Sequence, residues 1–267
     1  MSTWAQVKEN KKIGEGIFRL RLEAPDIAAM AQPGQFVMLR VSHGLDPLLA
    51  RPFSIHGVDG GDLFILYKVV GKGTRLLSLK RPGNKTLSLW GPLGKGFDLD
   101  MQRPVLVAGG MGIAPLAFAA QRLGSQGKEA PLLCGLLSTK GFENLTGSIS
   151  ALVEATAERG RVTWATEDGS AGHHGLVTHL LESALSSFPD SSPCGGVLAC
   201  GPMPMLKAVA QICAQHKVPC QVSLEAPMAC GLGACLGCVI PATGGGYVRA
   251  CQEGPVMDAK AVDWERL

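Results

Sequence analysis

Short apolar segments separated by glycine and proline dominate the first hundred residues of the chain. They recur from about Val7 to Leu99 as alternating or continuous apolar runs, each only a few residues long. Runs of this length between turn-forming residues are typical of antiparallel strands. The expected strands are residues 17–22, 35–41, 52–56, 63–70 and 87–90. This part of the chain is therefore predicted to form a small antiparallel β-barrel.

The pattern changes at Pro104, where apolar strands begin to alternate with segments long enough to be helices. The expected strands are residues 104–108, 131–137, 161–166, 197–199 and 221–224. Repeated strand–helix units predict a parallel, doubly wound α/β sheet. After Glu225 a third pattern begins, in which a run of glycines at 244–246 precedes Tyr247, Val248 and Arg249. This predicts a hairpin that returns the chain to the preceding loop.

These changes of pattern divide the chain into three predicted parts. The expected boundaries are a barrel over 1–99, an α/β domain over 100–224 and a small C-terminal subdomain over 225–267. A chain of 267 residues is long enough for two domains with cores of their own and one appendage.

The composition of the chain argues against some classes of partner and indicates the compartment in which the protein works. The net charge of +3 is small, only 5% of residues are aromatic, and the basic residues are scattered, which argues against nucleic acid as a partner. The first twelve residues are polar and charged, unlike a signal peptide, and no apolar stretch approaches the length of a membrane span. Free thiols without an export signal indicate a reducing cytoplasm.

The most informative chemical feature is a group of cysteines near the C-terminus. Three follow the spacing C-x4-C-x2-C and a fourth comes shortly afterwards: Cys230, Cys235, Cys238 and Cys251. Plant-type ferredoxins use this spacing to hold a [2Fe–2S] cluster. No charged residue lies between Pro227 and Pro241, and Gly231, Gly233 and Gly237 allow a tight loop whose amides can turn toward cluster sulfurs.

Zinc binding and disulfide bonds are the two other uses that such cysteines have in proteins. Structural zinc usually takes thiolates from two C-x2-C pairs, whereas this run contains one C-x2-C and one C-x4-C. A disulfide framework is disfavoured because nine cysteines is an odd number and the chain is too long to need covalent cross-links. Four further thiols are expected to be small buried hydrophobic side chains: Cys134, Cys194, Cys213 and Cys220.

A second feature is the segment PVLVAGGMGIAPLAFAAQRL, in which a buried strand leads into glycines and then a helix opened by Pro115. Gly109, Gly110 and Gly112 would let the backbone approach a pyrophosphate near the positive end of the helix dipole. The strict G-x-G-x-x-G fingerprint is broken by the proline, so a simple tight connection stays open as an alternative to dinucleotide binding.

A weaker feature lies at the end of the fourth expected strand of the α/β sheet. There the tripeptide Cys200, Gly201 and Pro202 stands at the edge where such sheets bind ligands.

Another weaker feature lies in the barrel, where a run with one arginine is followed by short polar and aromatic segments. These are Arg51, Pro52, Phe53 and Ser54, then Leu66, Tyr67 and Lys68, then Gly73 and Thr74. Arginine can bind a pyrophosphate and aromatic rings can cover a flavin, although a barrel core with one structural arginine explains them nearly as well.

Taken in order, the barrel with R-P-F-S, the strand–G-G-M-G-I-A-P–helix, T-E-D-G-S, C-G-P and the four-cysteine loop resemble the ferredoxin–NADP reductase superfamily. The chain is most similar to the family of electron-transfer subunits of class 1B dihydroorotate dehydrogenases. The C-terminal segments SLEAPMACGLGACLGCVIP and YVRACQEGPVM are the most specific part of this resemblance.

The resemblance implies a role for each of these residues. It implies that FAD binds at Arg51, Pro52, Phe53, Ser54, Leu66, Tyr67, Lys68, Gly73 and Thr74, and NAD at Gly109, Gly110, Met111, Gly112 and Pro115. It also implies that Cys200, Gly201 and Pro202 lie beside the nicotinamide and that Glu167, Asp168 and Gly169 form a turn near the nucleotide. Phe53 stands where many members of the superfamily have tyrosine, so ring stacking is expected there without a hydroxyl contact.

The implied activity is electron transfer in pyrimidine (UMP) biosynthesis. Electrons would pass from dihydroorotate to FMN on a partner subunit, then through the [2Fe–2S] cluster and FAD to NAD+, because only a flavin converts between one-electron and two-electron carriers. A heterotetramer of two such chains with two FMN-containing catalytic subunits is implied, and the charge-free cysteine loop with Leu232 and Leu236 is expected to face the partner.

Two rival functions stay open at this point. One is the NAD(P)-linked flavin and iron–sulfur subunit of a ferredoxin-dependent transhydrogenase or sulfhydrogenase. The other is a non-catalytic redox sensor or zinc-stabilised nucleotide-binding protein. The residues alone do not decide between NAD and NADP. No acidic residue can be assigned to the ribose, and the sequence does not say whether Lys140, near the end of the second α/β strand, meets a phosphate.

Overall fold

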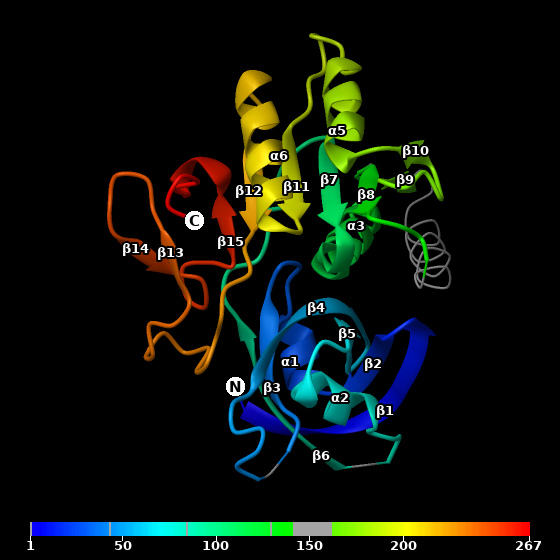
Figure 1. Ribbon diagram of the computed structural model, residues 1–267, viewed down its shortest axis with the longest axis vertical. Coiled ribbons are helices and arrows are strands. Elements are labelled where there is room, and N and C mark those ends of the chain that lie inside the picture. The colour runs from blue at the N-terminus through cyan, green and yellow to red at the C-terminus, as the bar shows by residue number, and fades with distance from the viewer. Residues whose placement is uncertain (1, 43, 84, 129, 141–161) are drawn as a thin grey trace.

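The computed structural model describes residues 2–42, 44–83, 85–128, 130–140 and 162–267. Two lobes lie one above the other, with the barrel below and the α/β domain above, and the C-terminal segment runs along one side of both (Figure 1). Among the helices of these residues, none combines the length and apolar character needed to cross a membrane.

The lower lobe is a closed antiparallel barrel with the strand order β1-β2-β5-β4-β3-β6. Its strands are β1 (Ser2–Gly14), β2 (Ile17–Glu23), β3 (Phe36–Arg40), β4 (Arg51–Asp59), β5 (Asp62–Lys68) and β6 (Lys85–Leu93), and its short helices are α1 (Pro25–Met30) and α2 (Lys72–Ser78). Alternate residues such as Leu20, Leu22, Leu63 and Ile65 fill the interior and are fully buried. The predicted barrel is confirmed.

The first strand was not predicted. β1 extends over thirteen residues, but only Ala5, Val7 and Ile13 in it are buried. Apart from the exposed Trp4 and from Gly14, its other positions are polar or charged, so its sequence carries little apolar alternation. Pairing with β2 along one edge and with β6 along the other fixes it as a strand and closes the barrel.

The upper lobe is a seven-stranded sheet in the order β10-β9-β8-β7-β11-β12-β15. Its strands are β7 (Pro104–Gly109), β8 (Leu132–Leu136), β9 (Val162–Thr166), β10 (His173–His174), β11 (Gly196–Cys200), β12 (Cys220–Ser223) and β15 (Val256–Asp258). All neighbours are parallel except β12 and β15. Every residue of the central strand β7 is buried, as expected for a strand covered on both faces. The predicted α/β sheet is confirmed.

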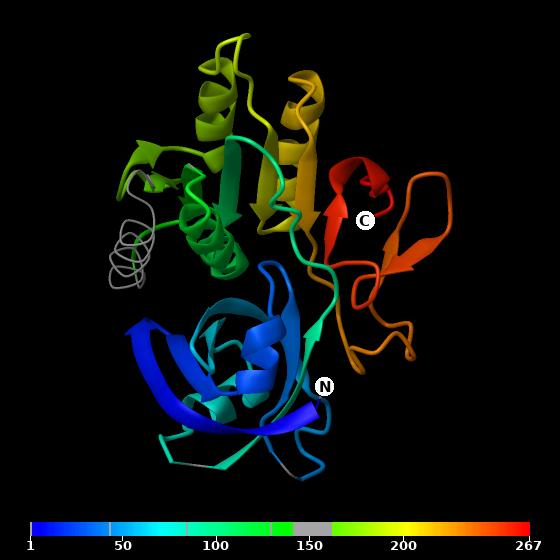
Figure 2. The ribbon, with the colours of Figure 1, turned by 180° about the vertical axis from the view of Figure 1, so that it is seen from behind.

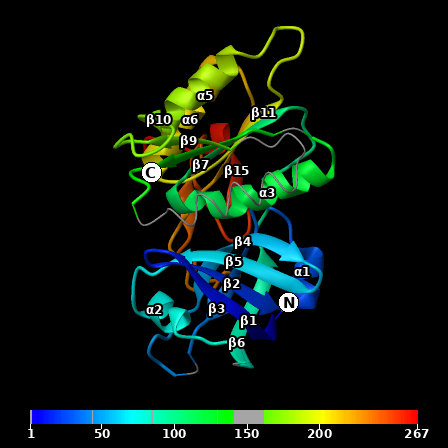
Figure 3. The ribbon, with the colours of Figure 1, turned by 90° about the vertical axis from the view of Figure 1, so that its right-hand side faces the viewer.

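Helices cover both faces of this sheet. α3 (Ile113–Ser125) follows the short 3-10 helix η1 (Gly110–Gly112) and lies between the sheet and the barrel, whereas α5 (Val177–Ser186) and α6 (Met203–Gln215) cover the opposite face (Figure 3). α3 therefore begins two residues before Pro115, which lies in its first turn. Since α3 packs against β4, it joins the two lobes.

The C-terminal segment contains the predicted hairpin. β13 (Val239–Pro241) pairs antiparallel with β14 (Tyr247–Arg249), and the Ala250 amide bonds to the Cys238 carbonyl at 2.9 Å, so Cys251 returns to the cysteine loop. The segment then adds β15 to the edge of the α/β sheet and ends in the 3-10 helix η2 (Ala259–Ala261) (Figure 2). The division at 1–99, 100–224 and 225–267 stays a prediction.

Candidate functional site

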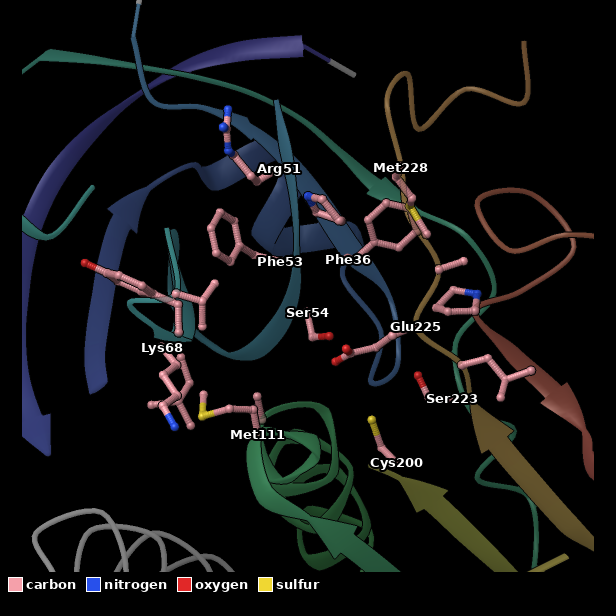
Figure 4. A pocket seen from close by; sticks show the side chains of 18 of the residues that line it. Phe36, Arg51, Phe53, Ser54, Lys68, Met111, Cys200, Ser223, Glu225 and Met228 are labelled. Carbon is pink, nitrogen blue, oxygen red and sulfur yellow. The ribbon is translucent and has the colours of Figure 1, made fainter. Parts of the chain in front are cut away.

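A cavity of about 300 Å³ lies where the barrel, the α/β domain and the start of the C-terminal segment meet (Figure 4). Eight of the nine residues expected at the flavin line it: Arg51, Pro52, Phe53, Ser54, Leu66, Tyr67, Lys68 and Thr74. Met111 and Cys200, expected at the nicotinamide nucleotide, line it as well. Segments separated by about 150 residues thus share one cavity, of a size suited to part of a cofactor.

The barrel side of the cavity has a rigid aromatic wall. The rings of Phe53 and Tyr67 meet edge to face with centroids 5.9 Å apart, and Phe18 stacks on Tyr67 at 5.5 Å. The Tyr67 hydroxyl donates to Asn10 Oδ1 at 3.0 Å, and burial raises the Tyr67 pKa, so the phenol stays protonated. These contacts fix the aromatic wall in place and suit it to the flat face of a ring system.

Arg51 and the start of α2 form a second, polar part of the cavity. A Cβ on Gly73 would lie 2.2 Å from Arg51 Nε, so glycine is required there for the arginine to lie across the helix start. Thr74 Oγ1 accepts hydrogen bonds from the Val70 and Gly71 amides at 2.9 and 3.1 Å, which orders this turn. Gly73 is the one predicted flavin residue that does not line the cavity, and its contact with Arg51 explains its presence. The guanidinium suits a phosphate.

Cys200 ends β11 and faces the cavity beside two residues that the sequence did not single out, Ser223 and Glu225 (Figure 4). Burial is the main cause that raises the pKa of the Cys200 thiol to about 12; the Glu225 charge adds to this, and a hydrogen bond from Ser223 opposes it. Cys200 is therefore a neutral thiol. Glu225 is the last charged residue before the charge-free run, and this is the signal that could have identified it.

The glycines in and around η1 have two different roles: some permit close packing, and one leaves its backbone accessible. A Cβ on Gly112 would lie 2.0 Å from the Cys200 carbonyl oxygen, so glycine there lets η1 pack against the end of β11. A Cβ on Gly109, the last residue of β7, would lie 2.5 Å from Met205 Sδ, so glycine there lets β7 pack against the start of α6. A Cβ on Gly201 would likewise lie 3.0 Å from Gly109 Cα. Gly110 has φ +53° and open space around it, which leaves its backbone accessible to a ligand. Six residues expected at the nicotinamide nucleotide do not line the cavity: Gly109, Gly110, Gly112, Pro115, Gly201 and Pro202.

The T-E-D-G-S turn follows β9 and joins the loop after β8. The Asp168 amide bonds to the Leu137 carbonyl at 3.2 Å, and the Thr139 amide bonds to Ser170 Oγ at 2.9 Å. Hydrogen bonds from Ser138 and then Ser170 lower the pKa of Asp168 to about 2, so it is ionised at neutral pH. This turn lies outside the cavity, at the carboxyl edge where parallel sheets bind nucleotides.

The four cysteine thiols gather in two interacting pairs, Cys230 with Cys235 and Cys238 with Cys251. Backbone amides point at their sulfurs: Leu232 N lies 3.3 Å and Cys235 N 3.5 Å from Cys230 Sγ. These bonds lower the pKa of Cys230 to about 6, whereas burial and then Cys238 raise that of Cys251 to about 11. The expected turning of amides toward sulfur is confirmed.

This arrangement fits a binuclear cluster. In a [2Fe–2S] centre with four cysteines, each iron takes two thiolates, which matches two pairs of thiols. In the described part of the chain, no group of three or more His, Cys, Asp or Glu side chains could hold a metal ion as placed, so the fit to a cluster rests on the two pairs of thiols. All nine cysteines are free, and the four expected to be buried hydrophobic side chains are buried.

A continuous segment, residues 225–230, connects the cavity to the cysteine loop. Glu225, Ala226 and Met228 line the cavity, and Cys230 follows two residues later. Trp90 Nε1 on β6 donates to the Cys230 carbonyl at 3.2 Å, which ties the loop to the barrel. A Cβ on Gly231 would lie 2.5 Å from Met38 Cγ, so glycine permits close packing there. The thiol cluster and the cavity are therefore held against each other by the barrel.

Comparison with known proteins agrees with this geometry. Residues 225–263 match the model of the iron-sulfur cluster binding domain of dihydroorotate dehydrogenase B. Proteins named dihydroorotate dehydrogenase B (NAD(+)), electron transfer subunit, are 38% identical over 262 residues in Desulforamulus reducens and 36% identical over 257 residues in Clostridium acetobutylicum. The alignments cover 95% of this chain and 95% of the first relative, and 96% and 94% for the second.

Solved structures share the fold. An NADH-dependent reduced ferredoxin-NADP oxidoreductase superposes with a TM-score of 0.85 at 28% identity, covering 99% of this chain and 91% of that one. A ferredoxin NADP+ reductase from Neisseria gonorrhoeae, solved with FAD and NADP, gives a TM-score of 0.61 at 18% identity over 80% of this chain and 91% of that one. The second likeness concerns the fold alone.

Proposed function

The chain belongs to the family of dihydroorotate dehydrogenase B electron transfer subunits. We propose that it receives electrons from a catalytic subunit, which oxidises dihydroorotate, and passes them on to NAD+. The observation that supports this most is the segment 225–230, which lines the cavity at one end and leads into the four paired thiols at the other. A redox centre in the loop would thus lie next to a ligand in the cavity.

We assign the barrel side of the cavity to FAD. Phe53 and Tyr67 would contact its ring system, Ser54 and Lys68 would supply polar contacts, and Arg51 would bind its phosphates. When bound, FAD converts between the hydride chemistry of NAD and the one-electron chemistry of a [2Fe–2S] cluster. The protein's part is to hold the ring against this rigid aromatic wall and to exclude water.

We assign the α/β side of the cavity to the nicotinamide end of NAD. Met111 and Cys200 form its floor, and the neutral Cys200 thiol contributes bulk rather than charge. The Glu225 carboxylate also lines the cavity, near Cys200, and supplies a hydrogen-bond acceptor. Gly110 would present its backbone to the pyrophosphate.

The four thiolates of Cys230, Cys235, Cys238 and Cys251 would hold the [2Fe–2S] cluster, two on each iron. The amides of Leu232, Cys235 and Gly233 would then donate to ligand sulfurs. Hydrogen bonds of this kind stabilise the added negative charge of a reduced centre.

We further propose that the cysteine loop docks on an FMN-containing catalytic subunit, in an assembly of two chains of each kind. The loop presents exposed apolar side chains, Leu232 and Leu236, within a run that has no charged residue from Pro227 to Pro241. An exposed apolar patch of this kind favours a protein partner. The free cysteines support a cytoplasmic location.

One specific observation favours a second function. The similarity to an NADH-dependent reduced ferredoxin-NADP oxidoreductase covers nearly the whole chain, although at 28% rather than 36–38% identity. The NAD(P)-linked subunit of such an enzyme is therefore the alternative, and the partner that co-purifies distinguishes the two. The zinc-stabilised alternative loses its support, because the matching domain is an iron–sulfur domain.

The proposed function is tested by anaerobic titration of the purified chain with NADH, followed by absorbance and electron paramagnetic resonance. We expect bleaching of flavin absorbance and the appearance of a reduced [2Fe–2S] signal. Cys235→Ala should abolish the cluster signal and leave flavin reduction intact, whereas Cys134→Ala, at a buried thiol in β8, should change neither. Wild-type protein lacking iron and acid-labile sulfide would refute the proposal.

A further inference from the structure

Arg249, at the end of β14, is held in one orientation by Glu253. Its Nη2 and Nε donate to the two carboxylate oxygens of Glu253 at 2.5 and 3.2 Å, and its backbone amide donates to Glu253 Oε2 at 2.8 Å. Paired hydrogen bonds between a guanidinium and a carboxylate are strongly directional. The arginine is therefore fixed at the turn that carries Cys251, two residues before that cysteine in the sequence.

The remaining arm of the guanidinium reaches the cysteine loop. Arg249 Nη1 donates to the Gly233 carbonyl at 3.4 Å, and the Gly233 amide donates to Cys251 Sγ at 3.2 Å. Gly233 has φ +79°, and a Cβ there would lie 2.8 Å from Gln252 Cγ and 3.2 Å from Arg249 Nη1. The loop backbone thus passes close against the Cys251 turn, with its carbonyl on Arg249 and its amide on the sulfur.

The backbone of Arg249 also organises this turn. Its carbonyl accepts the amides of Gln252 at 3.0 Å and Glu253 at 2.9 Å, which fold the chain around Cys251. One residue therefore contacts both segments that supply cysteines: its main chain shapes the turn of Cys251, and its side chain holds the loop between Cys230 and Cys235.

We propose that Arg249 is a positioning residue for the iron–sulfur centre: locked by Glu253, it holds the Gly233 carbonyl and so keeps the Gly233 N–H directed at the Cys251 sulfur. This inference rests on the proposed function, since it concerns the cluster those thiols would hold. Hydrogen bonds to ligand sulfurs stabilise the reduced cluster and so raise its reduction potential.

The geometry separates this role from a simple effect of charge. Glu253 balances the positive charge of Arg249, so the pair adds little net charge near the cysteines. A lysine would keep that charge, but it could not bind both carboxylate oxygens and the Gly233 carbonyl in the same fork. Arg249→Lys should therefore behave like Arg249→Gln.

The test compares Arg249→Gln and Arg249→Lys with wild type as purified flavin and iron–sulfur protein. Midpoint potentials are measured by redox titration monitored by electron paramagnetic resonance, and pulsed spectra before and after exchange into D2O report the exchangeable proton near the cluster. We expect both variants to weaken that proton coupling and to make one-electron reduction of the cluster about tenfold less favourable, equivalent to about 59 mV.

Arg266→Gln is the matched control. Arg266 Nη2 bonds to the Tyr247 hydroxyl at 2.9 Å and its Nη1 lies 3.7 Å from Asp263 Oδ2, so it contacts the same hairpin without reaching the cysteine loop through these bonds. Its substitution should leave the potential and the proton coupling at wild-type values.

The inference is overturned if Arg249→Lys keeps the wild-type potential, because charge alone would then suffice, or if Arg249→Gln changes neither readout. Should Arg249→Gln lose its cluster during purification, Arg249→Lys, which keeps the positive charge, provides the comparison and is expected to lower the potential. A wild-type protein without iron and sulfide refutes the proposed function itself, whereas unchanged variants with a normal cluster refute only this inference.

Discussion

At the scale of single residues, burial decides the protonation state of His56. This side chain on β4 is buried, and its Nδ1 donates to the Ala114 carbonyl at 3.0 Å, linking the barrel to α3. Burial is the main cause that lowers the His56 pKa to about 4, although the hydrogen bond to Ala114 opposes the shift. A neutral imidazole is thus built into the contact between the lobes.

His56 should make the protein less stable in acid. The unfolded side chain binds a proton below about pH 6.5, but the folded one binds it only below about pH 4, so its stabilising effect is complete above pH 6.5 and is lost as the pH falls toward 4. We expect a loss of about 2 kcal/mol in the free energy of unfolding between pH 7 and pH 5 from this group. Denaturant unfolding at both values should show a smaller loss in His56→Gln.

The control for this comparison is His216→Gln. His216 is paired with Glu182 at 2.9 Å on the surface, and its removal should not reproduce the effect. An equal acid loss in His56→Gln and wild type would contradict the assignment.

Single residues also show where sequence patterns lose information. Cys200 was predicted from its tripeptide, but Ser223 and Glu225 were not, although all three line the same cavity. A lone serine or glutamate in a sequence has no distinguishing spacing. Only the packing of β11 beside β12 brings these side chains to one place.

At the scale of elements, the close packing of η1 against β11 places the glycine turn beside Cys200. Gly112→Ala would put a Cβ 2.0 Å from the Cys200 carbonyl oxygen, which is a backbone atom that cannot rotate away. We expect at least a tenfold loss of NADH affinity, measured by the NADH dependence of flavin reduction, with flavin content retained.

Gly57→Ala in β4 provides a matched control, because its nearest neighbour outside the adjoining chain is Gln121 Oε1 at 3.5 Å, an ordinary contact. It should bind NADH like wild type. Wild-type affinity in Gly112→Ala would show that the turn does not depend on this close packing.

Two of the strands that the sequence did not predict, β1 and β15, were missed for related reasons. β1 carries only three buried residues, and β15 is three residues long, so neither has a periodicity strong enough to be detected. Both exist because a neighbouring strand offers unpaired backbone groups: β2 and β6 for β1, and β12 for β15. Such strands are consequences of the fold rather than of their own sequence.

At the scale of the whole molecule, Trp90 connects the barrel to the cysteine loop. Trp90→Phe keeps an aromatic ring but removes the hydrogen bond to the Cys230 carbonyl, at a cost of about 1 kcal/mol. We expect the cluster absorbance to be lost at a lower temperature than in wild type, while flavin release is unchanged. Trp164→Phe, on β9, is the control, and it should lose its cluster absorbance at the same temperature as wild type.

The docking proposal belongs to this scale as well. Leu232→Asp or Leu236→Asp should weaken binding to the catalytic subunit at least tenfold, as measured by titration and gel filtration, while the cluster spectrum is retained. Leu79→Asp is the control, because Leu79 is 63% exposed, much like Leu236 at 60%, but follows α2 on the barrel. An intact complex with both cysteine-loop variants would count against docking through this surface.

The sequence by itself determined the features that depend on contiguous residues. The spacing of four cysteines, the glycine turn after a buried strand and the alternation of short strands in the barrel are local, because each arises from the geometry of a few bonds. These were enough to predict the fold class and to place the cysteines together.

Only the tertiary structure decided which distant residues share a site. Ser54, Cys200 and Glu225 come together because α3 packs on the barrel and β15 draws the C-terminal segment along the sheet. The hydrogen bonds of Arg249 to Glu253 and to Gly233 could not be predicted from a local sequence pattern either. Such contacts depend on how whole elements pack, and packing is a property of the complete chain rather than of any segment.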